Sequence, residues 1–228
     1  GFGESFTRGE WDSPDVVGLL KLLIDNRDVL TSRAARPGVL AAAANRIFHA
    51  RRKNTVAGSR RNIHDHYDLG NDFFSRFLDP TMTYSCGVFR RGDDTLEQAQ
   101  CNKLDAIIEK ARIGPDDHVL EIGCGWGSFA IRAARKTGCR VTGISISEEQ
   151  CRLARERVAA AGLEDRVAIM NEDYRRMEGT FSRIVSIEML EAVGHEHFGS
   201  FFASCDRLLD TDGLIVLQVI TIPDQRYA

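Results

Sequence analysis

The sequence predicts an α/β fold in which a mostly parallel sheet follows a helical N-terminal half. Two observations carry this prediction: apolar residues recur at helical spacing before about residue 115, and short apolar segments alternate with amphipathic ones after it. The 228 residues are 43% hydrophobic and 28% charged, which is ordinary for a folded protein and excludes collagen-like, low-complexity and wholly disordered chains. No apolar run approaches the ~18 residues of a membrane span, and no signal peptide is recognisable at the start.

The N-terminal half contains the predicted helices. Ser13, Pro14 and Asp15 are typical of a helix start, and apolar residues follow at helical spacing through Ile24. Further helical segments are expected at 38–56, within 62–79 and at 95–111, the last opened by a capping box of Thr95 and Gln98.

Strands and helices alternate in the C-terminal half. Strands are expected at 118–122, 140–146, 167–170, 184–187 and 214–220, and the helices between them at 128–136, 147–162 and 197–209. Such alternation implies a parallel sheet with right-handed crossovers.

Charge is distributed unevenly along the chain. The formal net charge is −3, but eight of the 30 basic residues and none of the 33 acidic ones lie from Arg33 to Arg61. This segment therefore carries +8 and the remainder −11. Apolar residues beside these cations are typical of an interfacial helix on anionic lipid, so we expect contact with a membrane surface. A solvated face is the alternative, and the scarcity of interleaved aromatic residues argues against nucleic acid.

The six cysteines predict neither a zinc site nor a disulfide framework. None forms a C-x-x-C pair, so free thiols in a reducing cytosol are expected. The spacing of Glu191, His195 and His197 permits a metal, but no fourth ligand is evident and we predict none.

A glycine-rich turn from Gly123 to Gly127 lies between the first predicted strand and the next helix. Glycines let the backbone turn sharply and approach a ligand closely. Glu121, two residues before the turn, suits an amino or sulfonium cation better than a pyrophosphate, which favours S-adenosylmethionine over NAD. The second strand ends without an acid for a ribose, so Ser145 and Gln150 are expected to serve instead. A purely structural turn is the alternative.

Six motifs carry a family resemblance. They are His66-Tyr-Asp-Leu-Gly-Asn-Asp-Phe-Phe74, Met82-Thr-Tyr-Ser-Cys-Gly87, Thr95-Leu-Glu-Gln-Ala-Gln100, Leu120-Glu-Ile-Gly-Cys-Gly-Trp-Gly127, Gly143-Ile-Ser-Ile-Ser-Glu-Glu-Gln150 and Glu188-Met-Leu-Glu-Ala-Val-Gly194. Together they resemble the cyclopropane-fatty-acyl-phospholipid synthase family, which includes mycolic acid cyclopropane synthases and related lipid methyltransferases. Residues 1–5 and 9–11 also fit, so the resemblance covers nearly the whole chain.

The resemblance implies a Rossmann-like class I methyltransferase sheet under an N-terminal helical lipid-binding cap. It divides the chain into a helical region at 1–60, a helical cap and active-site cover at 61–113, and an S-adenosylmethionine-binding domain at 114–228. The implied reaction transfers a methyl group from S-adenosylmethionine to a cis double bond of an unsaturated phospholipid acyl chain. A proton then leaves the new methyl, with bound bicarbonate as the implied acceptor, and a cyclopropane ring closes.

The resemblance also assigns individual residues. The implied cofactor contacts are Tyr84, Ser85, Glu121, Gly123, Gly125, Ser145, Gln150, Asp173, Tyr174 and Glu188. The implied catalytic positions, around bicarbonate, are Cys86, Glu191, Gln218 and Ile220.

Two features depart from the family pattern. Gln218 stands where many members have a histidine, and a glutamine exchanges hydrogen bonds but is neither acid nor base at neutral pH. The family also continues past Arg226 with two more strands and a catalytic tyrosine. We therefore expect the chain to be a fragment that lacks the last strands and can be inactive by itself.

Three alternatives to ring formation stay open. They are a methyl-branching relative with the same cofactor and lipid, a small-molecule N-methyltransferase of the coclaurine type, and a non-enzymatic lipid-binding remnant. Cys86 and the basic segment argue against the second. Because the implied substrate lies in a bilayer, we expect a cytoplasmic protein, peripheral on the inner face of the membrane; a homodimer stays open.

Overall fold

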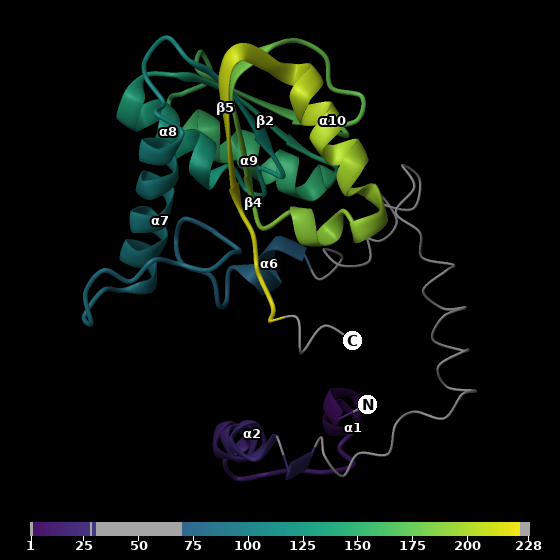
Figure 1. Cartoon of the computed structure of the whole chain (residues 1–228). Coiled ribbons are helices and arrows are strands. Elements are labelled where there is room, and N and C mark those ends of the chain that lie inside the picture. Colours follow the sequence, from purple (N-terminus) through teal and green to yellow (C-terminus); the bar gives the residue numbers. More distant parts are fainter. Residues whose placement is uncertain (1, 28, 31–69, 224–228) are drawn as a thin grey trace. The chain divides into compact units, whose positions relative to one another are not determined.

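A computed structural model describes residues 2–27, 29–30 and 70–223 (Figure 1). The chain divides into two compact units, Gly1–Arg51 and Arg52–Ala228. The helix predicted at 38–56 and the basic segment from Arg33 to Arg61 lie outside the described residues.

The described residues of the first unit include the helices α1 (Phe2–Thr7) and α2 (Val16–Asp25). The predicted start of α2 is confirmed, because the Asp15 side chain accepts a backbone hydrogen bond from the first turn. The Trp11 ring stacks on Phe2 at a centroid distance of 4.4 Å, and its indole N–H donates to the Phe2 carbonyl. An aromatic contact and a helix cap thus give this short unit its local order.

The second unit is a helix-flanked parallel sheet. Its elements are α6 (Gly70–Phe74), α7 (Leu96–Lys110), β1 (His118–Ile122), α8 (Ser128–Thr137), β2 (Arg140–Ser145), α9 (Glu148–Ala160), β3 (Val167–Asn171), β4 (Phe181–Ile187), α10 (Phe198–Leu208) and β5 (Leu209–Gln218), with 3₁₀ turns at Leu190–Ala192 and His195–His197. The strand order is β3-β2-β1-β4-β5, and every neighbouring pair is parallel. The predicted α/β class is therefore confirmed.

The last two strands differ from the predicted bounds. β4 begins three residues earlier than expected, and β5 runs from Leu209 to Gln218 rather than over 214–220. The register between them shifts between Phe181 and Arg183, so the start of β5 is irregular. Ile220 consequently lies beyond the strand.

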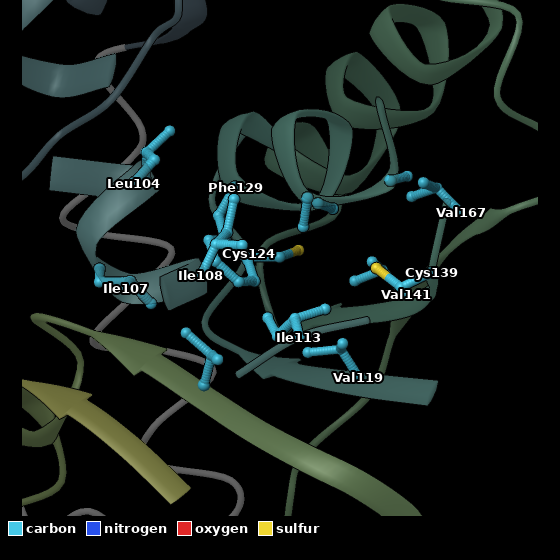
Figure 2. Close-up of a cluster of buried hydrophobic side chains, with 14 of the residues drawn as sticks. Leu104, Ile107, Ile108, Ile113, Val119, Cys124, Phe129, Cys139, Val141 and Val167 are labelled. Carbon is cyan, nitrogen blue, oxygen red and sulfur yellow. The ribbon is translucent and has the colours of Figure 1, made fainter. Parts of the chain in front are cut away.

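Both faces of the sheet carry a hydrophobic core. On one face, α7, α8 and α9 pack on the sheet through a cluster that includes Leu104, Phe129 and Val141 (Figure 2). On the other face, α10 packs Phe201 and Leu208 on the sheet. Each fully buried side chain of this size contributes roughly 1.5–3 kcal/mol. The three layers fix the strand ends that carry the candidate site.

Local hydrogen bonds set the helix starts. The predicted capping box is confirmed, since the Gln98 backbone N–H donates to Thr95 Oγ1 at 3.2 Å and the Thr95 N–H donates to Gln98 Oε1 at 2.7 Å. Ser147 Oγ caps α9 by accepting from the Gln150 N–H at 3.3 Å, but the reciprocal half of a capping box is absent, because Gln150 Oε1 accepts from Ser145 Oγ. Across the described part of the chain, no helix has the length and apolarity to cross a bilayer, and no cluster of potential metal ligands occurs.

Candidate active site

The carboxyl ends of the parallel strands meet at one edge of the sheet, where ligands of open α/β folds bind. The five expected site positions that follow or end the five strands gather at this edge: Gly123 after β1, Ser145 at the end of β2, Asp173 after β3, Glu188 after β4 and Gln218 at the end of β5. The sheet thus assembles side chains that are far apart in the sequence.

The glycine-rich turn after β1 has a left-handed backbone at each of its three glycines. Their φ values are 84°, 52° and 80° at Gly123, Gly125 and Gly127. A Cβ on Gly123 would lie 2.8 Å from Met189 Cγ, whereas a Cβ on Gly125 would meet no atom within 4 Å. The turn therefore packs directly against the segment after β4 and leaves open space at Gly125, as a cradle for a ligand requires.

Glu121 lies in β1, just before this turn, and its side chain is only 3% exposed. Burial raises the pKa of its carboxyl well above the ordinary value, although a backbone hydrogen bond at Ala130 and the charge of Lys103 act in the opposite direction. Its Oε2 atom is buried and has no hydrogen-bond partner in the described structure. Such an orphaned acceptor fits a ligand that brings an amino group or another cation.

A pair of buried polar side chains lies where an acid often contacts a ribose. Ser145 Oγ donates to Gln150 Oε1 at 2.9 Å, and both residues are buried at the junction of β2 and α9. Asn171, at the end of β3, donates to the Ser145 carbonyl at 3.2 Å. The expected stand-ins Ser145 and Gln150 are thus adjacent and ordered by their neighbours.

The expected cofactor contacts that follow β3, Asp173 and Tyr174, have partners within the protein. Asp173 is 1% exposed and is joined to the Arg175 guanidinium at 2.5 Å. Burial alone would raise the pKa of Asp173, but its hydrogen bonds with Arg175 outweigh burial and hold that pKa below its usual value. The Tyr174 ring contacts Phe201 edge-on at 5.4 Å, and burial raises its pKa. These two residues hold the loop after β3.

The loop that contains Tyr84, Ser85 and Cys86 is held on α7. Gln100 Nε2 donates to the Ser85 carbonyl at 2.7 Å, and Lys103 Nζ donates to Ser85 Oγ at 2.5 Å. The Tyr84 ring contacts Phe74 edge-on at 5.3 Å and stays 50% exposed. Ser85 therefore positions the loop, while Tyr84 presents an accessible aromatic face beside Cys86.

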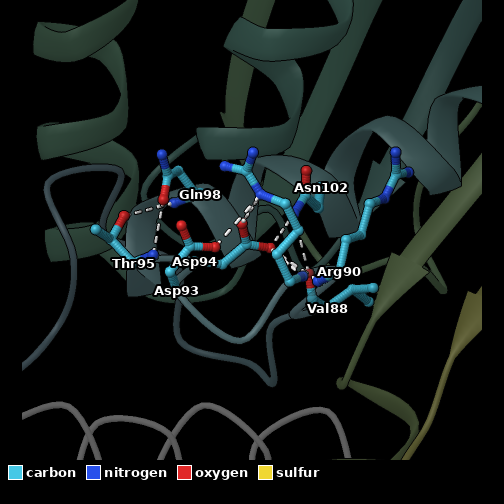
Figure 3. A network of polar contacts seen from close by, with 8 residues as sticks. Val88, Arg90, Asp93, Asp94, Thr95, Gln98 and Asn102 are labelled. Atoms are coloured by element: carbon cyan, nitrogen blue, oxygen red, sulfur yellow. Dashed lines mark hydrogen bonds and ion pairs between the residues drawn. The ribbon is translucent and has the colours of Figure 1, made fainter.

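The continuation of this loop is closed by a polar network (Figure 3). Asp94 accepts from the backbone N–H of Arg90 at 2.8 Å and from Asn102 Nδ2 at 3.0 Å, and Asn102 also donates to the Val88 carbonyl. The hydrogen bond from the Arg90 backbone N–H is the main cause that lowers the pKa of Asp94. The network fixes the segment from Val88 to Asp94 on α7.

Lys103 is a site residue that the sequence did not predict. It is 1% exposed, and burial lowers its pKa to about 8 against the favourable charges of Glu188, Cys86 and Glu121. The available signal was its position on the apolar face of α7, one turn before Ile107 and one turn after Ala99. A lysine at a core position of a helix is rare unless its charge has partners.

The expected catalytic residues form two pairs: Cys86 with Gln218, which both donate to Glu188, and Ile220 with Glu191. Glu188 Oε1 accepts from the Cys86 backbone N–H at 2.9 Å and from Gln218 Nε2 at 2.8 Å. Gln218 Nε2 also lies 3.3 Å from Cys86 Sγ, and the Glu188 hydrogen bond is the leading cause of the raised pKa of the Cys86 thiol. In the second pair, the Ile220 backbone N–H donates to Glu191 Oε1.

These contacts occupy hydrogen-bond donors that a bicarbonate bound at this cluster would need. The Cys86 N–H and the Gln218 amide both donate to Glu188, and the Ile220 N–H donates to Glu191. An added anion would have to displace a carboxylate of the chain from each of these donors.

Comparison with known proteins agrees with this geometry. Residues 54–228 match the family of mycolic acid cyclopropane synthetases. The chain belongs to this family. The family resemblance and the Rossmann-like class I methyltransferase fold are thereby confirmed.

Individual relatives of this cyclopropane synthetase family extend the match. The chain is 41% identical to a tuberculostearic acid methyltransferase of Mycobacterium tuberculosis (99% of this chain, 54% of the relative) and 38% identical to the cyclopropane-fatty-acyl-phospholipid synthase of Escherichia coli (96% and 56%). A solved mycolic acid cyclopropane synthase complexed with SAH and CTAB superposes with a TM-score of 0.67 at 38% identity (69% and 55%). The chain spans about half the length of these curated relatives.

Proposed function

We propose that the protein transfers a methyl group from S-adenosylmethionine to an unsaturated phospholipid acyl chain. The observation that carries the proposal is the buried, unpartnered Oε2 of Glu121 beneath a glycine turn that is open at Gly125. This arrangement offers a buried carboxyl group that a cationic cofactor would hold in its ionised form, and a close backbone approach to that cofactor. The SAH in the related cyclopropane synthase structure supports the same cofactor.

When bound, S-adenosylmethionine supplies an electrophilic methyl group on a sulfonium. Glu121, Gly123, Gly125, Ser145 and Gln150 would hold it at the carboxyl edge of the sheet. An alkene is a weak nucleophile, so the protein's main task is to hold the acyl chain against that methyl.

The aromatic and polar cover over this edge suits the cation that forms next. The exposed face of Tyr84, supported by Phe74, can stabilise a carbocation. The loop held by Ser85 and Lys103 would exclude water, which would otherwise trap the cation. Loss of a proton from the new methyl then closes a cyclopropane ring.

The proposal also specifies the product of the methyl transfer. One relative is named a tuberculostearic acid methyltransferase and another a cyclopropane synthase, so methyl branching is the second candidate. Both outcomes begin with the same transfer. We favour ring closure, because Met189 packs against Gly123 of the glycine turn and the carboxylate of its neighbour Glu188 can accept the proton. Bicarbonate, implied by the resemblance, is the rival acceptor.

Contact with a membrane surface completes the proposal. The +8 segment from Arg33 to Arg61 suits anionic lipid, and in the first unit α2 exposes Val17, Leu22 and Ile24. We propose a peripheral protein on the cytoplasmic face. Sedimentation with anionic vesicles, but not with zwitterionic ones, is the expected result; equal sedimentation with both would contradict it.

The test of the activity uses S-adenosylmethionine labelled at the methyl and the protein that carries this chain. Label should enter vesicles of cis-monounsaturated phosphatidylglycerol and not matched saturated vesicles. NMR of the released fatty acids then distinguishes a cyclopropane from a methyl branch. Label in soluble amines without label in lipid would contradict the proposal and revive an N-methyltransferase.

A further inference from the structure

Glu188 has an unusual backbone for a glutamate. Its φ is 48°, in the left-handed region that non-glycine residues rarely adopt, and its own N–H donates to the Gln218 carbonyl at 2.8 Å. Strain of this kind persists only where the surroundings impose it, and it gathers at functional sites. The backbone at Glu188 therefore directs the side chain at a cost in conformational energy.

The Glu188 carboxylate accepts hydrogen bonds from a small group of donors that can bind an anion. The Cys86 backbone N–H and the Gln218 amide converge on one oxygen, Oε1, at 2.9 and 2.8 Å. The buried ammonium of Lys103 adds a favourable positive charge. A carboxylate held by donors on one oxygen keeps acceptor capacity on the other, which is what a base requires.

The location matches the expected reaction centre. Met189, the next residue, contacts the position of Gly123, and Ser186 Oγ donates to the Ile122 carbonyl at 2.8 Å, so the segment containing Glu188 lies directly against the cofactor turn. On the loop that contributes the Cys86 N–H to this carboxylate, the side chains of Cys86 and Tyr84 are exposed.

Other acids near this edge are less suitably placed. Glu121 is buried in β1 just before the turn, Asp173 is paired with Arg175, and Glu191 is exposed to solvent, where water competes for its carboxylate. Glu188 is thus the carboxylate best placed for proton transfer in this part of the described structure.

We propose that Glu188 is the base that removes the proton from the transferred methyl, in the place that the resemblance gives to bicarbonate. This inference rests on the proposed lipid methyl transfer. The methyl C–H bond breaks, its electron pair forms the second C–C bond of the ring at the cationic carbon, and the proton passes to a Glu188 oxygen. The neutral Glu188 then returns the proton to solvent, and no further reactant is consumed.

The first test compares two substitutions at Glu188. Glu188→Gln keeps an oxygen for the Cys86 and Gln218 donors but cannot accept a proton at neutral pH. We expect the turnover rate to fall by roughly 10²–10⁴-fold, the usual contribution of a general base. Affinity for S-adenosylmethionine should stay unchanged, whereas a cofactor-binding or merely structural role would weaken it. Glu178→Gln, an exposed carboxylate before β4, is the matched control and should behave as wild type.

Glu188→Gly tests the place of bicarbonate. Glycine suits the positive φ, so the fold should be retained while the Cys86 and Gln218 donors become available. Wild type should not respond to bicarbonate depletion in carbon-dioxide-free buffer, and added bicarbonate should restore part of the rate of Glu188→Gly. Wild type that stops without bicarbonate, together with an active Glu188→Gln, would overturn the inference.

A binding measurement separates this inference from the proposed function. Titration with ¹³C-bicarbonate, followed by NMR, should show binding to Glu188→Gly and none to wild type. Binding to wild type, with no gain in Glu188→Gly, would overturn the role of Glu188 even if no lipid is methylated. Absence of lipid methylation by wild type would contradict the proposed function, and with it the role of Glu188 as a base, whereas an intact binding pattern would still show that its carboxylate takes the place of bicarbonate.

Discussion

Gln218 donates a side-chain hydrogen bond to Glu188 at 2.8 Å, and this contact joins the carboxyl ends of β5 and β4. The register of the two strands places Gln218 opposite Ile187, so the sheet itself brings the pair together. The amide therefore orients the carboxylate that we propose as the base, a positioning role that a residue without acid or base chemistry can perform.

Gln218→Leu should reduce activity by weakening this orientation. Losing a hydrogen bond to a charged group costs about 1.5–3 kcal/mol, so kcat/KM should fall by about one to two orders of magnitude. Gln218→His keeps an N–H donor and should retain more activity than Gln218→Leu. Steady-state kinetics on unsaturated vesicles provides the measurement, and wild-type kinetics of Gln218→Leu would refute the role.

Lys103 should give the protein a specific dependence of stability on alkaline pH. Its pKa falls from 10.5 to about 8 on folding, so between these values the unfolded chain binds more protons than the folded one. The stability of wild type relative to Lys103→Met should therefore rise as pH increases through this interval. Denaturant unfolding at a series of pH values measures it, with exposed Lys110→Met as the control. Parallel curves for wild type and Lys103→Met would contradict the burial of this ammonium.

Glu121→Gln should have opposite effects on stability and on cofactor binding. Burial raises the folded-state pKa of Glu121, so the folded chain binds more protons and wild type loses stability as pH rises above the ordinary carboxyl range. The substitution should stabilise the ligand-free protein at neutral pH, with a smaller effect in acid. Affinity for S-adenosylmethionine should fall at least about tenfold, because a charged acceptor is lost. Thermal unfolding measures the stability, and calorimetry measures the affinity for S-adenosylmethionine. An unchanged affinity would show that Glu121 does not contact the cofactor.

Three glycine substitutions separate backbone strain from loss of the cofactor cradle. Gly125→Ala meets no protein atom, so it should cost only about 1 kcal/mol of stability yet weaken cofactor binding strongly. Gly123→Ala collides with Met189 and should lose both stability and binding. Gly162→Ala has similar strain, with φ 64°, after α9 and away from the turn, and should leave binding intact. Equal cofactor affinity in Gly125→Ala and Gly162→Ala would show that the turn is only structural.

The fold was predictable where local signals and hydrophobic periodicity agree. The capping box at Thr95 and Gln98 and the alternation of apolar segments after residue 115 predicted α7 and the order of strands and helices. The start of β5 was not predictable, because Gly213 is typical of a turn. Gly213 lies instead within β5, and the irregular register at the start of this strand depends on its pairing with β4.

The sequence predicted which residues belong to the site better than it predicted the contacts between them. The family motifs named Cys86, Glu188 and Gln218, but their mutual hydrogen bonds depend on a positive φ at Glu188 and on the pairing of β4 with β5. Lys103 was missed because a lysine in a helical pattern ordinarily indicates an exposed face. Its burial follows from the packing of the loop at Ser85, which only the tertiary structure shows.

The central claim is that a methyl group passes to the acyl chain and then gives up a proton. The most direct measurement incubates the protein with S-adenosylmethionine deuterated at its methyl group and with cis-monounsaturated phospholipid vesicles, followed by mass spectrometry of the fatty acids. The account predicts products that gain one carbon and keep two of the three deuterium atoms. Products that keep all three, or fatty acids that gain no deuterium, would contradict it.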